Sequence, residues 1–216
     1  MGPTGTIAAL AYGSNILRPS SPSPSDIGQA FARPCRRALH TRSRVDMTTR
    51  HAPLLGDTPE LATVLDFLRK IGIRIVDGAV TSDALLPAMT VRNGVLLYDP
   101  ARPGWVGDLL HEAGHLAVTD PALRDTLVQV GDDPAEEMAA IAWSYAAAMA
   151  IGMPVGTLFH AGYKGGPEYL IAAFAGGSPI GLPMLQYWGM AARTERSGQH
   201  DDGPAFPAMR TWLRSR

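Results

Sequence analysis

The stretch LLHEAGHLAV, residues 109–118, places two histidines and a glutamate in the order H-E-x-x-H. On a helix, His111 and His115 lie one turn apart on the same face, so their ring nitrogens can converge on one metal ion. Zinc accepts neutral imidazole and keeps a position for water when the protein supplies three ligands. Glu112 can then take a proton from that water as a general base. The spacing therefore predicts Zn²⁺-dependent hydrolysis.

A third ligand has to come from elsewhere in the chain, and its type sorts the zinc hydrolases. A metzincin motif continues with a glycine and a third histidine, but Val118 and Pro121 stand at those positions. A site with a nearby cysteine ligand is also disfavoured, because the only cysteine, Cys35, is far away in the sequence. The remaining choice is a carboxylate from a later helix.

The Ala-rich stretch PAEEMAAIAWSYAAAM, residues 134–149, offers two such carboxylates, Glu136 and Glu137. Glu137 shares a helix face with Ser144, which is the main polar interruption of an otherwise apolar helix. We expect that polar stripe to face the metal, so Glu137 is the predicted third ligand and Glu136 the alternative. Alternatively, either glutamate is simply a first-turn carboxylate that interacts favourably with the positive end of the helix dipole.

A peptidase also needs a donor that stabilises the oxyanion formed on the attacked carbonyl. The stretch LFHAGYKGG, residues 158–166, follows the Ala-rich helix and contains His160 and Tyr163. Tyr145, on that helix itself, is a further candidate. We select His160 as the predicted catalytic partner of Glu112.

The segments around these residues have recognisable periodicities. Apolar spacing predicts an amphipathic helix from about residue 58 to 71 and a helix over 105–118 that carries the motif. Short runs rich in Val, Ile and Leu predict strands within 73–80 and 93–99. The later helices are predicted over 122–128, 134–151, 167–175, 183–192 and 206–213. This pattern indicates an α+β fold, mostly helical, with a small sheet packed beside the H-E-x-x-H helix.

The order of these elements over residues 58–154 resembles that of the ImmA/IrrE-like metallopeptidases, which are gluzincins. LLHEAGHLAV matches the family's motif, and EEMAAIAW matches its third-ligand region loosely, without the family's asparagine. The resemblance implies a minimal zincin-like domain, with His111 and His115 as ligands and Glu112 as base. It also implies a cytoplasmic protein that cleaves a protein or peptide substrate, including regulatory proteins such as repressors.

Composition sets further expectations. Residues 1–50 are rich in Ser, Pro and Arg. This composition predicts a disordered extension, or one that lies upstream of a true start at Met47. A metallopeptidase domain with a helical C-terminal part is predicted over 51–216. With 19 Lys and Arg against 20 Asp and Glu, no excess positive charge favours nucleic acid or an anionic membrane. A single cysteine fits a reducing, cytoplasmic setting.

Two functions therefore remain open. The first is a zinc-dependent metalloendopeptidase, in which Glu112 activates water. The alternative is a non-catalytic zinc-binding module, in which the metal holds helices together and a partner protein docks on the chain.

Overall fold

The computed structural model describes residues 52–216, apart from residues 83, 132, 165, 178–179 and 194–202. The predicted N-terminal extension, with Cys35 and the alternative start at Met47, lies outside the described residues. Within the described part, no helix is both long enough and apolar enough to cross a membrane.

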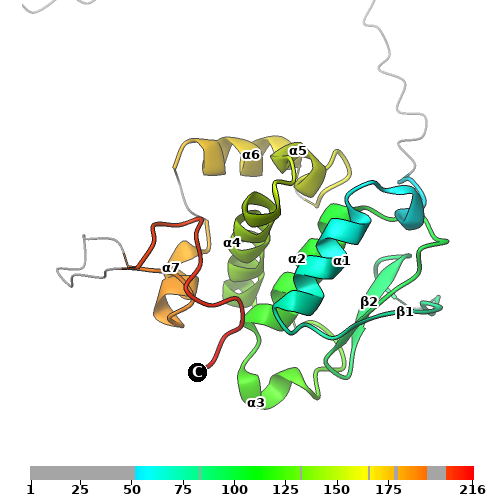
Figure 1. Ribbon diagram of the computed structural model, residues 1–216, viewed down its shortest axis with the longest axis horizontal. Helices are drawn as coiled ribbons and strands as arrows, with labels where there is room; N and C mark the ends of the chain where they lie inside the picture. The colour runs from blue at the N-terminus through cyan, green and yellow to red at the C-terminus, as the bar shows by residue number, and fades with distance from the viewer. Residues whose placement is uncertain (1–51, 83, 132, 165, 178–179, 194–202) are drawn as a thin grey trace, which may run out of the picture. The chain divides into compact units, whose positions relative to one another are not determined.

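Helices and a small sheet together form a fold of the α+β class, as predicted, with α4 near the centre of the view in Figure 1. In chain order the elements are the 3₁₀ helix η2 (Leu55–Asp57), α1 (Leu61–Lys70), β1 (Ile75–Asp77), β2 (Met89–Arg92), β3 (Val95–Tyr98), α2 (Val106–Val118), α3 (Pro121–Arg124), α4 (Pro134–Ile151), α5 (Val155–Leu158), α6 (Pro167–Ala175) and α7 (Leu182–Tyr187).

The sheet has the strand order β1-β3-β2, with β1 parallel and β2 antiparallel to β3. The hairpin between β2 and β3 turns at Asn93 and Gly94, whose φ angles of 52° and 66° are those of a type I′ turn. β2 and β3 both pack against α2, so the sheet does lie beside the H-E-x-x-H helix. Strand β2 was not among the predicted elements, and it is an edge strand of this sheet.

Helices α2 and α4 make the most extensive helix–helix contact among the described residues. α4 is apolar on nearly all sides, as a core helix is, and it ends at Gly152, where a φ of 72° closes the helix. Gly114 faces α4 so closely that a Cβ atom there would lie 2.9 Å from the carbonyl oxygen of Ala140. The two backbones are therefore in near contact at the centre of the motif.

The C-terminal part differs from its prediction. The predicted helix over 206–213 is wrong, because this segment is irregular and bonds to other elements instead of to itself. The Arg210 N–H donates to Met190 O, and the Arg214 N–H donates to Ala117 O at the end of α2. Tertiary contacts override helical propensity here. In Figure 1 the segment, drawn in red, runs beside α7 toward the lower ends of α4 and α2.

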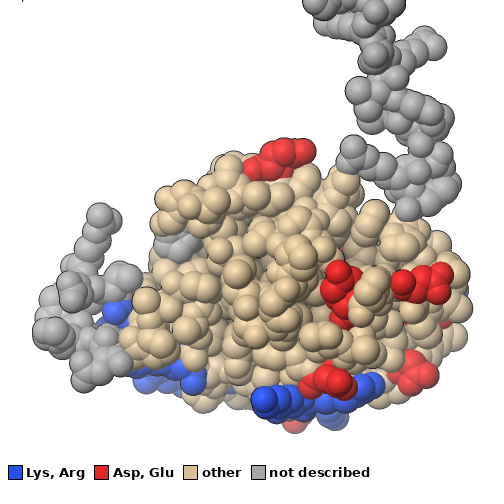
Figure 2. Space-filling view, turned by 45° about the horizontal axis from the view of Figure 1, so that its top comes forward, with Lys and Arg blue, Asp and Glu red and all other residues tan. Residues whose placement is uncertain are grey.

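Charged side chains are scattered over the face drawn in Figure 2. The described Lys and Arg residues visible there follow the lower edge, where Asp and Glu residues also lie beside them, and further Asp and Glu residues lie at the top and on the right. Most of this face is formed by uncharged residues.

Candidate metal centre

Helix α2 fixes the orientation of the motif because its other faces are buried. Leu109, Leu110 and Leu116 are at most 1% exposed, and they anchor the helix in the core. This leaves His111 and His115 on the side of α2 that faces the start of α4. The ring of His115 is itself buried, so a partner is required for its polar nitrogens.

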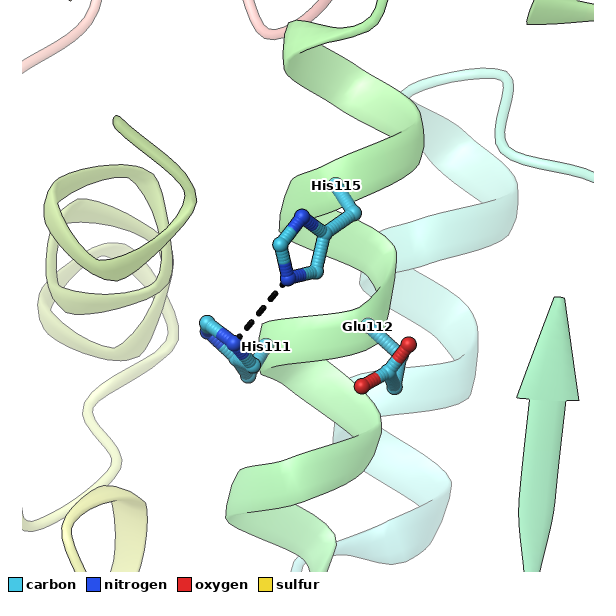
Figure 3. Close-up of side chains that lie close together, drawn as sticks. All are labelled: His111, Glu112 and His115. Atoms are coloured by element: carbon cyan, nitrogen blue, oxygen red, sulfur yellow. Dashed lines mark hydrogen bonds between the residues drawn. The ribbon is translucent and has the colours of Figure 1, made fainter. Parts of the chain in front are cut away.

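Three side chains bring donor atoms to one point between α2 and α4. The Nε2 atoms of His111 and His115 lie 3.1 Å apart on one side of α2 (Figure 3). Glu137 reaches across from α4, with Oε1 3.6 Å from His111 Nε2 and Oε2 3.3 Å from His115 Nε2. Ligands about 2.0–2.1 Å from a tetrahedral zinc ion lie about 3.3 Å from one another. The two imidazoles and the carboxylate therefore fit such an ion in both chemistry and spacing.

The neighbouring glutamates of α4 point to different partners. Glu137 contacts both histidines, and these hydrogen bonds hold the pKa of its carboxyl well below the ordinary value. Glu136 instead lies with Oε1 3.7 Å from Nη1 of Arg214. The polar stripe of Glu137 and Ser144 that was expected to face the metal is not formed. Ser144 donates to Ala140 O at 2.6 Å and lies against Gly114.

Glu112 leaves α2 in a different direction from the two histidines (Figure 3). Ligand-capable atoms of His111, Glu112 and His115 nevertheless lie within 4.8 Å of one another, so the carboxyl is adjacent to the donor group. Withdrawal from water raises the pKa of Glu112, and the two nearby histidines offset part of this rise. A carboxyl in that position is suited to accept and release protons.

The loop after α5 brings Tyr163, rather than His160, close to the donor group, by which we mean the possible metal-ligand atoms of His111, His115 and Glu137. The Tyr163 hydroxyl lies 3.3 Å from Nδ1 of His111, and burial raises the pKa of the phenol, so the group stays protonated. His160 is not among the described residues that line the cavity. Its Nε2 lies 2.8 Å from Asp108 Oδ1, and its Nδ1 accepts from the Gly162 N–H.

The structure therefore does not bring His160 to the side chains of His111, His115 and Glu137, and both of its ring nitrogens have partners within the protein. Tyr145 is also directed elsewhere, since its ring stacks on Phe174 with centroids 4.2 Å apart. Asp108 was not among the predicted site residues, although a residue three positions before His111 shares its helix face. Asp108 ties the loop that carries Tyr163 to α2.

A cavity of about 390 Å³ opens beside the donor group. One wall carries the polar residues Asp108, His111, Glu112, His115, Glu137 and Tyr163. The other walls come from β2 and from two loops, and they include six aliphatic or thioether side chains: Leu85, Leu86, Met89, Val91, Val128 and Val130. Leu85 and Val128 are 95% and 66% exposed, respectively, which is unusual for such side chains.

A scan against protein-family models found no match, and searches of the curated proteins and of the solved structures found no significant match either. What the site can do therefore follows from the geometry of its own side chains.

Proposed function

We propose that this protein is a zinc-dependent metallopeptidase with a gluzincin-type, zincin-like site. The observation that carries the proposal is the approach of the Glu137 carboxylate, from a second helix, to the Nε2 atoms of both His111 and His115. A pair of histidines that met by coincidence would not need a carboxylate from α4 at ligand spacing. The resemblance of the motifs to the ImmA/IrrE-like metallopeptidases agrees with this assignment, and it implies a cytoplasmic setting.

A zinc ion held by these three residues would lower the pKa of water toward neutrality and polarise a substrate carbonyl. Glu112 takes a proton from the attacking water as the new carbon–oxygen bond forms. The same carboxyl then passes the proton to the amine nitrogen as the carbon–nitrogen bond breaks. The raised pKa of Glu112 favours both transfers, because it brings the carboxyl closer to the working pH.

Tyr163 is placed to stabilise the oxyanion. When Nε2 of His111 faces the donor group, the proton of the neutral imidazole resides on Nδ1 and is donated to the Tyr163 oxygen. The phenol O–H is then available to donate into the cavity. Its raised pKa keeps that proton in place, so Tyr163 acts as a neutral hydrogen-bond donor.

The cavity wall favours a polypeptide substrate. β2 is an edge strand of the sheet, and all four of its residues, Met89–Arg92, line the cavity. An extended peptide can therefore add to this edge through main-chain hydrogen bonds, with its side chains alternating between pockets. The exposed Leu85 and Val128 at the cavity favour an apolar side chain near the scissile bond.

Zinc content tests the proposal without a known substrate. We expect about one zinc per chain, by elemental analysis, in wild-type protein purified without a metal affinity column. His115→Ala and Glu137→Ala should lose it, whereas Glu136→Ala should still reach about one zinc when zinc is in excess. Absence of metal from the wild type, with no uptake of added zinc, would refute the proposal.

The alternative is a non-catalytic zinc module, and one observation favours it: the donor atoms come from both α2 and α4, so a metal would also join these helices. Glu112→Gln separates the two functions. A peptidase with this change keeps its zinc and loses hydrolysis of a peptide library. A protein that only uses zinc to hold its helices shows no hydrolysis in either form.

A further inference from the structure

The end of α2 has an unusual cap. The last four carbonyl groups of a helix lack partners within the helix, and they need donors from elsewhere. His115 O accepts from the N–H and the hydroxyl of Thr119, at 3.0 and 2.7 Å. The other three carbonyls, those of Leu116, Ala117 and Val118, turn to two arginines.

Arg124 and Arg214 both donate hydrogen bonds to these carbonyls. The side-chain Nε of Arg124 donates to Leu116 O at 2.8 Å, and the backbone N–H of Arg214 donates to Ala117 O at 2.9 Å. Arg214 Nη1 also donates to Val118 O at 3.3 Å. The arginines are linked, because Arg124 Nη2 donates to Arg214 O at 2.6 Å. Two cations at the negative end of the helix dipole stabilise the end of α2 that lies one turn beyond His115.

Arg214 also reaches α4. Its Nη1 atom lies 3.7 Å from Glu136 Oε1, in the turn that carries Glu137. The guanidinium group stacks over the Trp188 ring, with Cζ 4.4 Å from the centroid, and the side chain is only 15% exposed. A largely buried guanidinium thus connects the end of α2 to the start of α4, the two helices that carry the possible ligands.

The neighbouring residues of the segment strengthen this connection. Trp143, in the middle of α4, donates from its indole Nε1 to Trp212 O at 2.9 Å. The Trp212 ring packs edge-on against Trp143 and against Phe67 of α1. The C-terminal segment Thr211–Arg214 is therefore tied to α1, α2 and α4 together.

We propose that Arg214 is a positioning residue for the metal centre. Its guanidinium contacts Glu136 of α4 and Val118 O of α2, and its backbone N–H bonds to Ala117 O of α2. Through these contacts Arg214 sets the distance and rotation at which Glu137 meets His111 and His115. The inference rests on the proposed zinc site, and it assigns a role to a segment that the motif reasoning left without one. Arg214 does not touch the donor atoms, so its effect is on their spacing.

The test measures zinc affinity by competition with a chromogenic chelator, together with thermal unfolding of the metal-free protein. Arg214→Met keeps a long side chain over Trp188 and the backbone N–H that bonds to Ala117 O, but it removes the guanidinium contacts to Val118 O and Glu136. We expect its zinc dissociation constant to rise about tenfold or more. Arg214→Lys should restore part of the affinity, because one ammonium can serve some but not all of the acceptors. Arg216→Met, at an exposed arginine two residues beyond Arg214, should match the wild type.

A second variant isolates the link to α4. Glu136→Ala leaves the donors to α2 in place, and it decides the question even where Arg214→Met fails to fold. We expect it to weaken zinc binding, and the double variant to be little weaker than Arg214→Met alone, because both changes break one connection. If zinc affinity is unchanged in Glu136→Ala and Arg214→Met, whatever the loss in unfolding temperature, Arg214 is only structural and the inference fails. A wild type that binds no zinc would instead refute the proposed function.

Discussion

Gly114→Ala tests whether the contact between α2 and α4 sets the geometry of the metal centre. An added Cβ would lie 2.9 Å from Ala140 O, 3.2 Å from Ser144 Oγ and 3.3 Å from Ala140 Cα, while ordinary contacts begin near 3.4 Å. The nearest obstacle is backbone, so α4 has to move by about half an ångström. Metal sites tolerate errors of about 0.2 Å in ligand distance. We therefore expect zinc affinity to fall about tenfold or more.

The metal-free protein should lose about 0–2 kcal/mol of stability. Overpacking costs about 1–3 kcal/mol, and replacing glycine by alanine within a helix returns about 1 kcal/mol. Tenfold weaker zinc binding removes about 1.4 kcal/mol of the stabilisation given by a fixed excess of zinc. For a domain of this size, that is a loss of roughly 3–6 °C from the zinc-induced rise in unfolding temperature.

Thermal unfolding with and without zinc provides the assay. Gly156→Ala is the matched control, because Gly156 lies in α5 with open space around its Cβ position. That control should show the full zinc-induced rise. The same full rise in Gly114→Ala would show that the α2–α4 spacing does not set the site, and the reasoning above would be refuted.

Three further results are expected. Zinc affinity should weaken as the pH falls, because protons compete with the ion for the ligand nitrogens, whereas the lowered pKa of Glu137 keeps that ligand ionised; chelator competition at several pH values measures this. Tyr163→Phe should keep its zinc and lower kcat on cleaved library peptides by about 10²–10³, and an unchanged kcat would remove the tyrosine from the mechanism. Leu85→Ser should reduce the preference for apolar residues at the cleavage site without changing the unfolding temperature. Tyr187→Ser, at an exposed position on α7, should leave that preference as it is.

Local signals accounted for the elements that hold the donor atoms. The apolar spacing around His111, with Pro134 and Gly152 at the ends of the long helix, was sufficient to predict α2 and α4. β2 was not predicted because it has only four residues, although the Asn93–Gly94 turn was a usable hairpin signal. The sequence thus contained more of the sheet than was inferred from it.

Long-range contacts account for what could not be predicted. Glu136 and Glu137 are neighbours of the same type, and only the position of Arg214, distant in the sequence, distinguishes their partners. His160 looked like the better donor from its residue type, but its pairing with Asp108 depends on how a loop folds back on α2. Neither contact leaves a trace in local periodicity.

The near contact of α2 and α4 at Gly114 also bears on the entropy of metal binding. At this contact the backbone of α2 at Gly114 meets the backbone of α4 at Ala140, which is fully buried. Glycine and alanine have no side-chain rotamers to lose, so this contact is already ordered when the chain has folded. Binding of an ion then has to immobilise little more than the rings of His111 and His115 and the Glu137 side chain. The protein should take up zinc with a small conformational entropy loss, as a rigid receptor does, rather than by coupled folding.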